Sequence, residues 1–158
     1  MKLSADNSNA RPGSTPGVRD HVKEKTDAFV ANGRLIAALE QRSQPVISGD
    51  ECVLFRQGET ARGIYILRSG EATLTMLSSG GHVLLKLRAT AGSLLGLPGV
   101  IGHEPYTLTG KVRRGSVVSF VSRTDFEELI RLDPSLSLGV CQVLAAEVRS
   151  ARQAISDL

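Results

Sequence analysis

The sequence contains no tryptophan, and aromatic residues make up only 4% of its 158 positions. Leu, Val and Ile side chains must therefore fill any hydrophobic core. No apolar run approaches the roughly 18 residues that a membrane span needs. The N-terminal stretch MKLSADNSNARPGSTPG also has no apolar segment of the secretory-signal type. These absences predict a cytoplasmic protein with no membrane partner.

Cysteine and histidine are also scarce, with two and three residues. Cys52 and Cys141 are far apart in the sequence and form no CxxC pair, which predicts two buried, reduced thiols rather than a disulfide framework or a metal site. His21, His82 and His103 show no HxH or HxxxH spacing of the kind that a metal-binding barrel needs. There is no P-loop and no GxSxG motif. We therefore expect no cofactor, no metal and no catalytic residue, and do not expect an enzyme.

Charge of one sign is not concentrated in any part of the chain. The 19 Lys and Arg residues and 16 Asp and Glu residues give a formal net charge of +3, and Arg113-Arg114 is the only adjacent basic pair. A nucleic-acid-binding domain usually gathers its basic residues on one face. We therefore expect no specific DNA binding by this chain alone.

Short β-type runs, separated by breakers that contain Gly, Ser or Asp, occupy the chain between Val46 and Ser122. In one of them Ala72, Leu74 and Met76 alternate with polar residues, as in a strand with one buried face. Short strands at steady spacing are typical of a sandwich or a jelly-roll barrel. The expected strands are residues 53–55, 63–67, 71–76, 82–88, 106–112 and 116–121.

Helical patterns flank these strands. Residues 19–41 carry apolar side chains at helical spacing, with Gly33 between two short helices and Pro45 beyond their end. After the strands, Thr124 and Glu127 have the spacing of a capping box.

Asp133-Pro134 then has the pattern of an N-cap followed by proline at the first helical position, which predicts a last helix running to the chain end. The expected fold is mainly β with flanking helices: a double-stranded β-helix (jelly-roll) barrel followed by a long C-terminal helix. The expected division is a disordered segment at 1–17, the barrel with its short flanking helices at 18–133, and a C-terminal dimerisation helix at 134–158.

The last helix carries an apolar stripe whose members are alternately three and four residues apart. This spacing is typical of a two-stranded coiled coil, whereas a helix that packs on its own barrel usually has a broader stripe. We expect a homodimer through this helix, with packing against the barrel as the alternative. The apolar stripe is Cys141, Leu144, Val148, Ala151, Ile155 and Leu158.

The order of helices, jelly roll and long helix, together with three glycine-bounded stretches, resembles the cyclic-nucleotide-binding domain of the catabolite-activator family of bacterial regulators. The stretches are GDECVLFRQGE at 49–59, GIYILRSG at 63–70 and GSLLG at 92–96. The resemblance implies a sensor domain related to transcription regulators. Members of this family continue beyond the long helix into a helix-turn-helix, and this sequence stops at Leu158, so we expect the sensor part without the DNA-reading part.

The resemblance also implies that GSLLGLPGVIGHEPYT, residues 92–107, is the phosphate-binding cassette, a short helix and loop whose free backbone N–H groups receive the cyclic phosphate. Where the family has a Glu for the ribose, this sequence has Leu97, and where it has an Arg for the phosphate, Tyr106 stands; Thr107 keeps a hydroxyl. The family's base-contacting Thr-Ser pair corresponds to Ala151-Arg152 on the long helix. The candidate ligand contacts are therefore Leu95, Gly96, Leu97, Pro98, Tyr106, Thr107 and Arg152.

Loss of the Arg removes a fixed positive charge and a bidentate hydrogen-bonding group. We therefore expect no tight binding of cyclic AMP and a small-molecule ligand of another kind, sensed by a non-catalytic regulatory domain. The alternative is a ligand-free module for dimerisation or protein interaction, in which the apolar cassette residues simply plug the barrel. His103, beside the cassette, is either a sensor of pH or ligand or an ordinary surface histidine.

Overall fold

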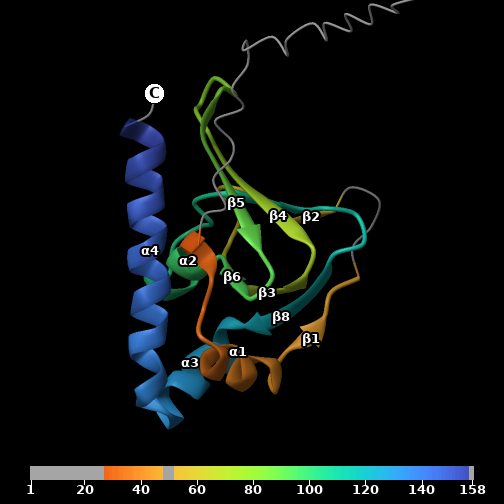
Figure 1. The fold of residues 1–158 in the computed structure, drawn as a ribbon, viewed down its shortest axis with the longest axis vertical. Helices are drawn as coiled ribbons and strands as arrows, with labels where there is room; N and C mark the ends of the chain where they lie inside the picture. The colour runs from red at the N-terminus through yellow and green to blue at the C-terminus, as the bar shows by residue number, and fades with distance from the viewer. Residues whose placement is uncertain (1–26, 48–51, 157–158) are drawn as a thin grey trace, which may run out of the picture.

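The computed structural model describes residues 27–47 and 52–156, which form a barrel of two four-stranded antiparallel sheets with helices along one side (Figure 1). The expected segment 1–17 lies outside the described residues. In chain order the elements are η1 (Asp27–Phe29), α1 (Gly33–Glu40), β1 (Gln44–Pro45), β2 (Val53–Phe55), β3 (Gly63–Ser69), β4 (Glu71–Leu77), β5 (Val83–Thr90), β6 (Ser93–Leu95), α2 (Leu97–Gly102), β7 (Thr109–Val112), β8 (Val117–Ser122), α3 (Arg123–Leu132), η2 (Pro134–Leu136) and α4 (Ser137–Ser156).

The two sheets have the strand orders β1-β8-β3-β6 and β2-β7-β4-β5, with every pair antiparallel. The expected jelly roll is confirmed, and each of the expected strands is present. The strand expected from residue 106 begins only at Thr109, because the backbone of Tyr106 bonds instead to Gly58 and Glu59 of the loop before β3. β1 and β6 were not expected, since runs of two and three residues carry no periodic signal.

Aliphatic side chains dominate the core between the sheets, as the lack of tryptophan predicts. Ala72 and Leu74 are buried on one face of β4, which confirms the alternation. Phe55 also lies inside, and it requires a glycine opposite: a Cβ on Gly110 would lie 2.6 Å from the Phe55 ring. Phe55 thus fills space between the sheets that is left open by the glycine opposite it.

Two helix starts differ from the expected positions. The N-cap of α3 is Ser122, whose hydroxyl accepts from the N–H of Asp125 at 3.1 Å, and Thr124 lies inside the helix. The capping-box prediction was therefore wrong, because β8 passes directly into α3 and Ser122 is still extended there. Gly33 begins α1 behind the N-cap Asn32, whose side chain accepts from the N–H of Leu35 at 2.8 Å.

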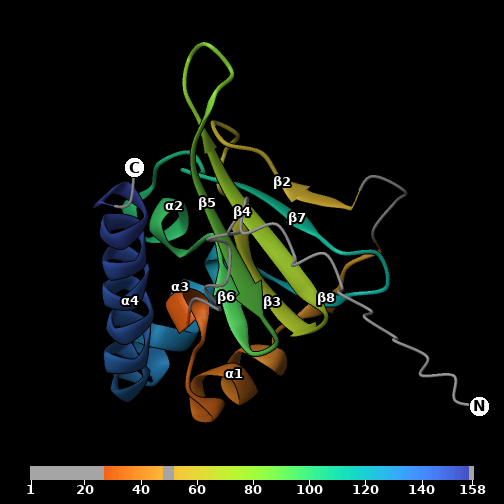
Figure 2. The ribbon, with the colours of Figure 1, turned by 45° about the horizontal axis from the view of Figure 1, so that its top comes forward.

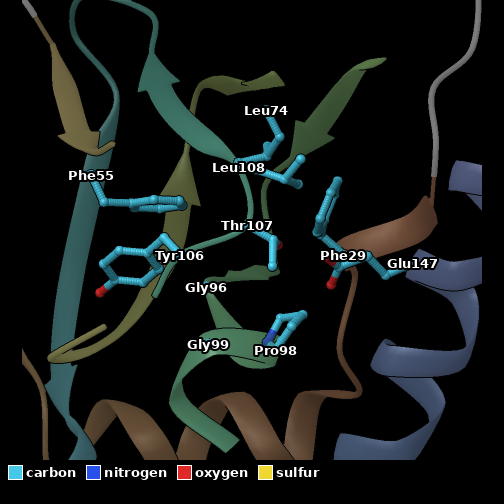
Figure 3. A pocket seen from close by; sticks show the side chains of 10 residues that line it. All are labelled: Phe29, Phe55, Leu74, Gly96, Pro98, Gly99, Tyr106, Thr107, Leu108 and Glu147. Carbon is cyan, nitrogen blue, oxygen red and sulfur yellow. The ribbon is translucent and has the colours of Figure 1, made fainter. Parts of the chain in front are cut away.

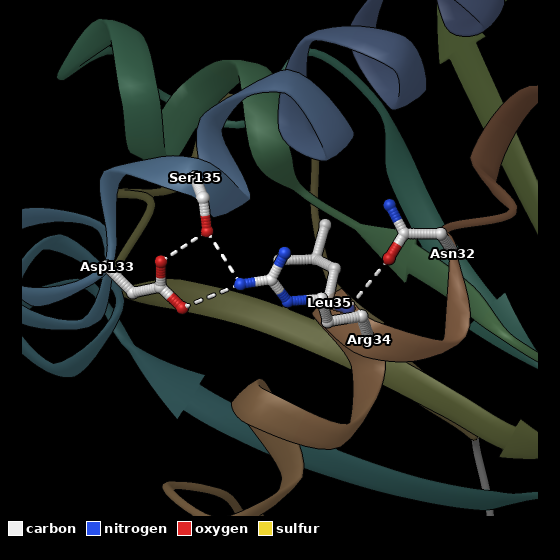
Figure 4. Close-up of polar contacts among 5 residues, drawn as sticks. All are labelled: Asn32, Arg34, Leu35, Asp133 and Ser135. Atoms are coloured by element: carbon white, nitrogen blue, oxygen red, sulfur yellow. Dashed lines mark hydrogen bonds and ion pairs between the residues drawn. The ribbon is translucent and has the colours of Figure 1, made fainter.

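The last helix begins, as expected, at Pro134, but first as the 3-10 turn η2, which passes into α4. α3 and the segment from Pro134 onwards meet at 108°. Side chains tie this corner to α1: Arg34 donates to Ser135 at 2.7 Å and pairs with Asp133 at 3.4 Å (Figure 4). The Ser135 hydroxyl also donates to Asp133, and this bond, followed by the charge of Arg34, lowers the pKa of the Asp133 carboxyl.

From this corner α4 runs along the barrel, where it packs against η1 and strand β5 and passes α2 (Figure 2). Gly139, Val140 and Val143 form its buried face. A Cβ on Gly139 would lie 2.6 Å from the side chain of Asn32, so the helix approaches α1 closely at this point. This contact fixes which face of α4 is directed at the barrel.

Candidate functional site

The short helix expected in residues 92–107 is α2, and two glycines shape it. Gly96 is its N-cap at φ 93°, in the left-handed region, and a Cβ there would lie 2.8 Å from the Tyr106 ring. A Cβ on Gly99 would lie 2.9 Å from Ala61 and 3.0 Å from the carbonyl oxygen of Glu104. Both positions therefore need glycine for α2 to lie this close to its neighbours.

A small pocket opens between α2, the chain leading to β7, η1 and α4 (Figure 3). Its volume is about 240 Å³ including the rim that is open to solvent, but the side chains leave room for only about one water molecule. Most of the lining is apolar, and within the described part of the chain no Lys, Arg or His contributes to it. The lining residues are Phe29, Phe55, Leu74, Gly96, Pro98, Gly99, Tyr106, Thr107, Leu108 and Glu147.

Tyr106, which the resemblance places at the position of a phosphate-binding Arg, is directed away from the pocket centre (Figure 3). Its hydroxyl donates to the carbonyl oxygen of Gly63 and accepts from the N–H of Gly63 at 3.4 Å. Its ring stacks on Phe55 with the ring centroids 4.4 Å apart. Burial raises the pKa of the phenol, so Tyr106 is a neutral wall of the pocket whose hydrogen-bonding group is already used.

The other expected contacts divide into two groups. Gly96, Pro98 and Thr107 line the pocket together with Tyr106. Leu95 and Leu97 do not line it, because both side chains are fully buried in the core. Arg152 is exposed on α4 and does not line the pocket either.

Glu147 of α4 was missed by the sequence analysis, although it lines the pocket. Its Oε2 atom is buried without a hydrogen-bond partner, and burial raises the pKa of the carboxyl from 4.5 to about 7. A helical signal was available in the sequence: Glu147 follows Val140 by seven residues and Val143 by four, which places the three on one face. The apolar stripe lies on the neighbouring face of the same helix.

His103 ends α2 with φ 52° and contacts α3. Its Nδ1 lies 2.8 Å from the guanidinium of Arg123, and its Nε2 lies 3.2 Å from the Glu127 carboxylate. Arg123 in turn donates to the carbonyl oxygen of Ala61 at 3.0 Å. Since the guanidinium can only donate, the geometry fits a neutral His103 that accepts at Nδ1 and donates from Nε2. His103 thus joins the cassette helix to α3, outside the pocket.

The fold places some side chains of the apolar stripe against the core and leaves others exposed to solvent. Leu144 and Ala151 pack against the edge of the core, whereas Val148 and Ile155 are 51% and 60% exposed. Cys141 is also exposed, so the expectation of two buried thiols was wrong for it; Cys52 is partly buried. The reason is that α4 directs Val140 and Val143 at the barrel, which turns Cys141 outward. Leu158 lies outside the described residues.

Next to the exposed part of the stripe, an apolar hollow of about 680 Å³ lies between α2, α3 and α4, with Ile101, Phe126 and Ile130 among its lining residues.

No group of three or more His, Cys, Asp or Glu side chains in the described ranges is arranged to hold a metal ion. Among the described helices none is by itself long and apolar enough to span a membrane. Only α3 and the segment that follows it, taken together across the bend between them, have the length and composition of a membrane span.

The model of the cyclic nucleotide-binding domain matches residues 49–133 of the chain. The transcriptional activator protein FnrA of Stutzerimonas stutzeri is 26% identical over 113 residues, which are 72% of this chain and 45% of FnrA. The chain therefore spans less than half the length of this relative.

Two solved structures show the same fold. The catabolite activator protein of Thermus thermophilus matches with a TM-score of 0.64 and 20% identity, over 79% of this chain and 59% of that one. The c-di-GMP responsive global regulator CLP of Xanthomonas campestris matches with a TM-score of 0.60 and 17% identity, over 80% and 62%. With its jelly roll, its cassette helix α2 and a family match across more than half of its length, the chain belongs to the cyclic nucleotide-binding domain family.

Proposed function

We propose that the chain is a non-catalytic sensor module of a cytoplasmic transcription regulator. In this proposal it binds a small molecule other than cyclic AMP in the pocket beside α2 and reports occupancy through a homodimer of α4. Residues 18–133 form the sensing unit and residues 134–158 the dimerisation helix. FnrA is a transcriptional activator and CLP is a global regulator of gene expression, which supports the general role. By itself this chain binds no DNA sequence specifically, since its basic residues are scattered.

The lining of the pocket is the observation that carries the choice of ligand. Tyr106 occupies the position of the phosphate-binding Arg, and its hydroxyl already bonds to Gly63. Leu97, in place of the ribose-binding Glu, is buried in the core. Each lost charge-assisted contact weakens binding by roughly 1.5–3 kcal/mol. Loss of both groups should leave cyclic AMP with little affinity, and the relative CLP is a regulator of the same fold that responds to a different molecule, c-di-GMP.

The exposed part of the apolar stripe supports the dimer. Cys141, Val148 and Ile155 are spaced by seven residues and are exposed along the outer side of α4. A coiled-coil contact surface uses two heptad positions, and here one of the two rows is exposed while Leu144 and Ala151 of the other row lie at the edge of the core. A second copy of α4 would cover the exposed row and place two sensing units beside one another.

A ligand-free module for dimerisation or protein interaction is the second candidate. It is favoured by the closed pocket, in which the lining side chains leave space for about one water molecule. In that case α2 plugs the barrel, and only the outer side of α4 is functional.

A thermal-unfolding panel with cyclic AMP, cyclic GMP, cyclic dinucleotides and small aromatic acids and amines separates these candidates. A true ligand at one hundred times its Kd adds about 2.7 kcal/mol to the free energy of unfolding, and light scattering on the same samples reports the oligomeric state. Stabilisation by one compound together with a change in dimerisation supports the sensor. A dimer that no compound affects supports the ligand-free module, and sub-micromolar binding of cyclic AMP contradicts the proposed ligand choice.

A further inference from the structure

The carboxyl group of Glu147 is the polar group that the family resemblance leaves unexplained. It comes from α4, reaches the pocket beside Phe29 (Figure 3), and has a buried Oε2 that receives no hydrogen bond within the described residues. A buried polar group without a partner is costly, and such groups are rare in folded proteins. A ligand that supplies the missing donor would remove this cost.

The other polar side chains in the lining do not compete for this role. The Tyr106 hydroxyl is engaged with Gly63, and Thr107 contributes a neutral hydroxyl to the pocket. An anionic ligand would lie in apolar surroundings against the Glu147 carboxylate, where repulsion between like charges is poorly screened. The polarity of the pocket is thus opposite to that of a phosphate site.

The basic residues of the neighbouring elements face elsewhere. Lys86 and Arg88 of β5 are exposed and alternate with the buried Leu85, Leu87 and Ala89, and Arg88 pairs with Glu71 at 3.7 Å. On α4 itself, Arg149 and Arg152 are exposed, and His103 of the cassette contacts Arg123 and Glu127. The titratable side chains that line the pocket are therefore Glu147 and Tyr106.

We propose that the pocket recognises a small aromatic amine, whose ammonium group donates to the Glu147 carboxylate while its ring lies among Phe29, Leu74 and Leu108. This inference rests on the proposed sensor function and gives its ligand a chemical class. The ring needs more space than the pocket now offers, so Phe29 must move when the ligand enters. Phe29 belongs to η1, which packs against α4, and its movement would carry the signal of occupancy to the dimerisation helix.

Three aromatic probes of similar size and different charge test the proposal on the full chain: benzylamine, benzyl alcohol and benzoate. Each is titrated at pH 8 while the amide resonances of Gly96, Gly99 and Leu108 are followed by NMR. We expect benzylamine to shift these resonances, benzyl alcohol to bind at least tenfold more weakly and benzoate not to bind. Lowering the pH to 5.5 should weaken benzylamine binding at least tenfold, since the carboxyl takes up a proton while the amine stays charged.

The variant Glu147→Gln keeps the shape of the side chain and removes its charge, so it should weaken benzylamine binding at least tenfold. The control Glu128→Gln makes the same change at an exposed carboxylate on α3 that does not line the pocket, and it should leave the affinity unchanged. If Glu147→Gln does not fold, the pH dependence of the wild-type chain still decides the question.

Equal or tighter binding of benzoate, equal affinity in Glu147→Gln, or no shift of the pocket amides by benzylamine would each overturn the proposal. These outcomes are separate from a failure of the sensor function. If an anion or another molecule from the thermal panel stabilises the chain and shifts the same amides, the sensor stands and only the amine is wrong. If no compound in either experiment affects the protein, both proposals fail.

Discussion

The two sides of α4 show how one helix takes two different roles. Its inner side places Val140 and Val143 in the core and Glu147 at the pocket, whereas its outer side leaves Val148 and Ile155 half exposed. Apolar residues occur on both sides, so hydrophobicity alone does not separate them. The contrast teaches that the exceptions to ordinary burial, a polar residue on the inner side and apolar residues on the outer side, are the places to which the proposed functions are assigned.

The largest effect is expected on the inner side. Val143 is 1% exposed, so Val143→Asp buries a carboxylate without a partner and removes apolar packing. We expect a loss of about 4 kcal/mol or more in the free energy of unfolding, which leaves little folded protein. Urea unfolding followed by circular dichroism measures this loss. A folded Val143→Asp protein would show that α4 does not need its inner contacts.

The matched change on the outer side is Val148→Asp. Val148 is 51% exposed, so the folded monomer should keep nearly all its stability, but a dimer would bury two like charges in an apolar contact. We expect the dimer Kd to rise at least a hundredfold, which corresponds to about 2.7 kcal/mol. Light scattering across protein concentrations measures the change. A wild-type chain that is monomeric at tens of micromolar, or a variant that dimerises normally, would show that the outer side of α4 is not a dimer contact.

The third prediction concerns the pH dependence of the free energy of unfolding, which tests the burial of Glu147 on the inner side of α4. Burial raises the pKa of its carboxyl from 4.5 to about 7, so between these values the folded chain holds a proton that the unfolded chain has lost. The free energy of unfolding should therefore fall as the pH rises through this window, by up to about 3 kcal/mol, and stay low above it. Urea unfolding at pH 5 and pH 8 should show a smaller pH dependence for Glu147→Gln. Equal pH dependence in the two proteins would mean that Glu147 is solvated.

The smallest loss of stability is expected for a change at Tyr106, on the wall of the pocket opposite Glu147. Tyr106→Phe keeps the stacking on Phe55 but removes the hydroxyl that bonds to both backbone groups of Gly63. We expect a loss of about 1–2 kcal/mol in the free energy of unfolding, with no change in its dependence on pH between 5 and 8. Denaturant unfolding measures both quantities. Wild-type stability in Tyr106→Phe would show that the hydroxyl bonds are replaced by water.

Most of the barrel was predictable because its signals are local. The alternation in β4 and the glycine-containing turns between strands follow from the two-residue period of a strand and from steric limits on the backbone. α2 was predicted from the resemblance, and its glycines are required by close contacts that the structure shows. β6 was missed, because a three-residue strand is recognisable only by its partner β3.

The differences between the expected ligand contacts and the pocket lining concern the orientation of side chains. Leu97 was expected at the ligand because of its place in the motif, but its side chain is fully buried in the core. Arg152 was expected there too, whereas Glu147, more than one turn earlier on α4, is the residue that lines the pocket. A motif gives the order of residues along the chain, and it does not give the rotation of a helix about its axis.

The sequence by itself determined the longer strands and the bent, glycine-containing segment at residues 92–107, since each depends on residues close together in the chain. Only the tertiary structure decided which side of α4 faces the barrel. Apolar residues at spacings of three and four are compatible with either a partner helix or the chain's own core. The close approach of Gly139 to Asn32 fixes the choice: it places Val143 inside, Glu147 at the pocket and Val148 at the surface.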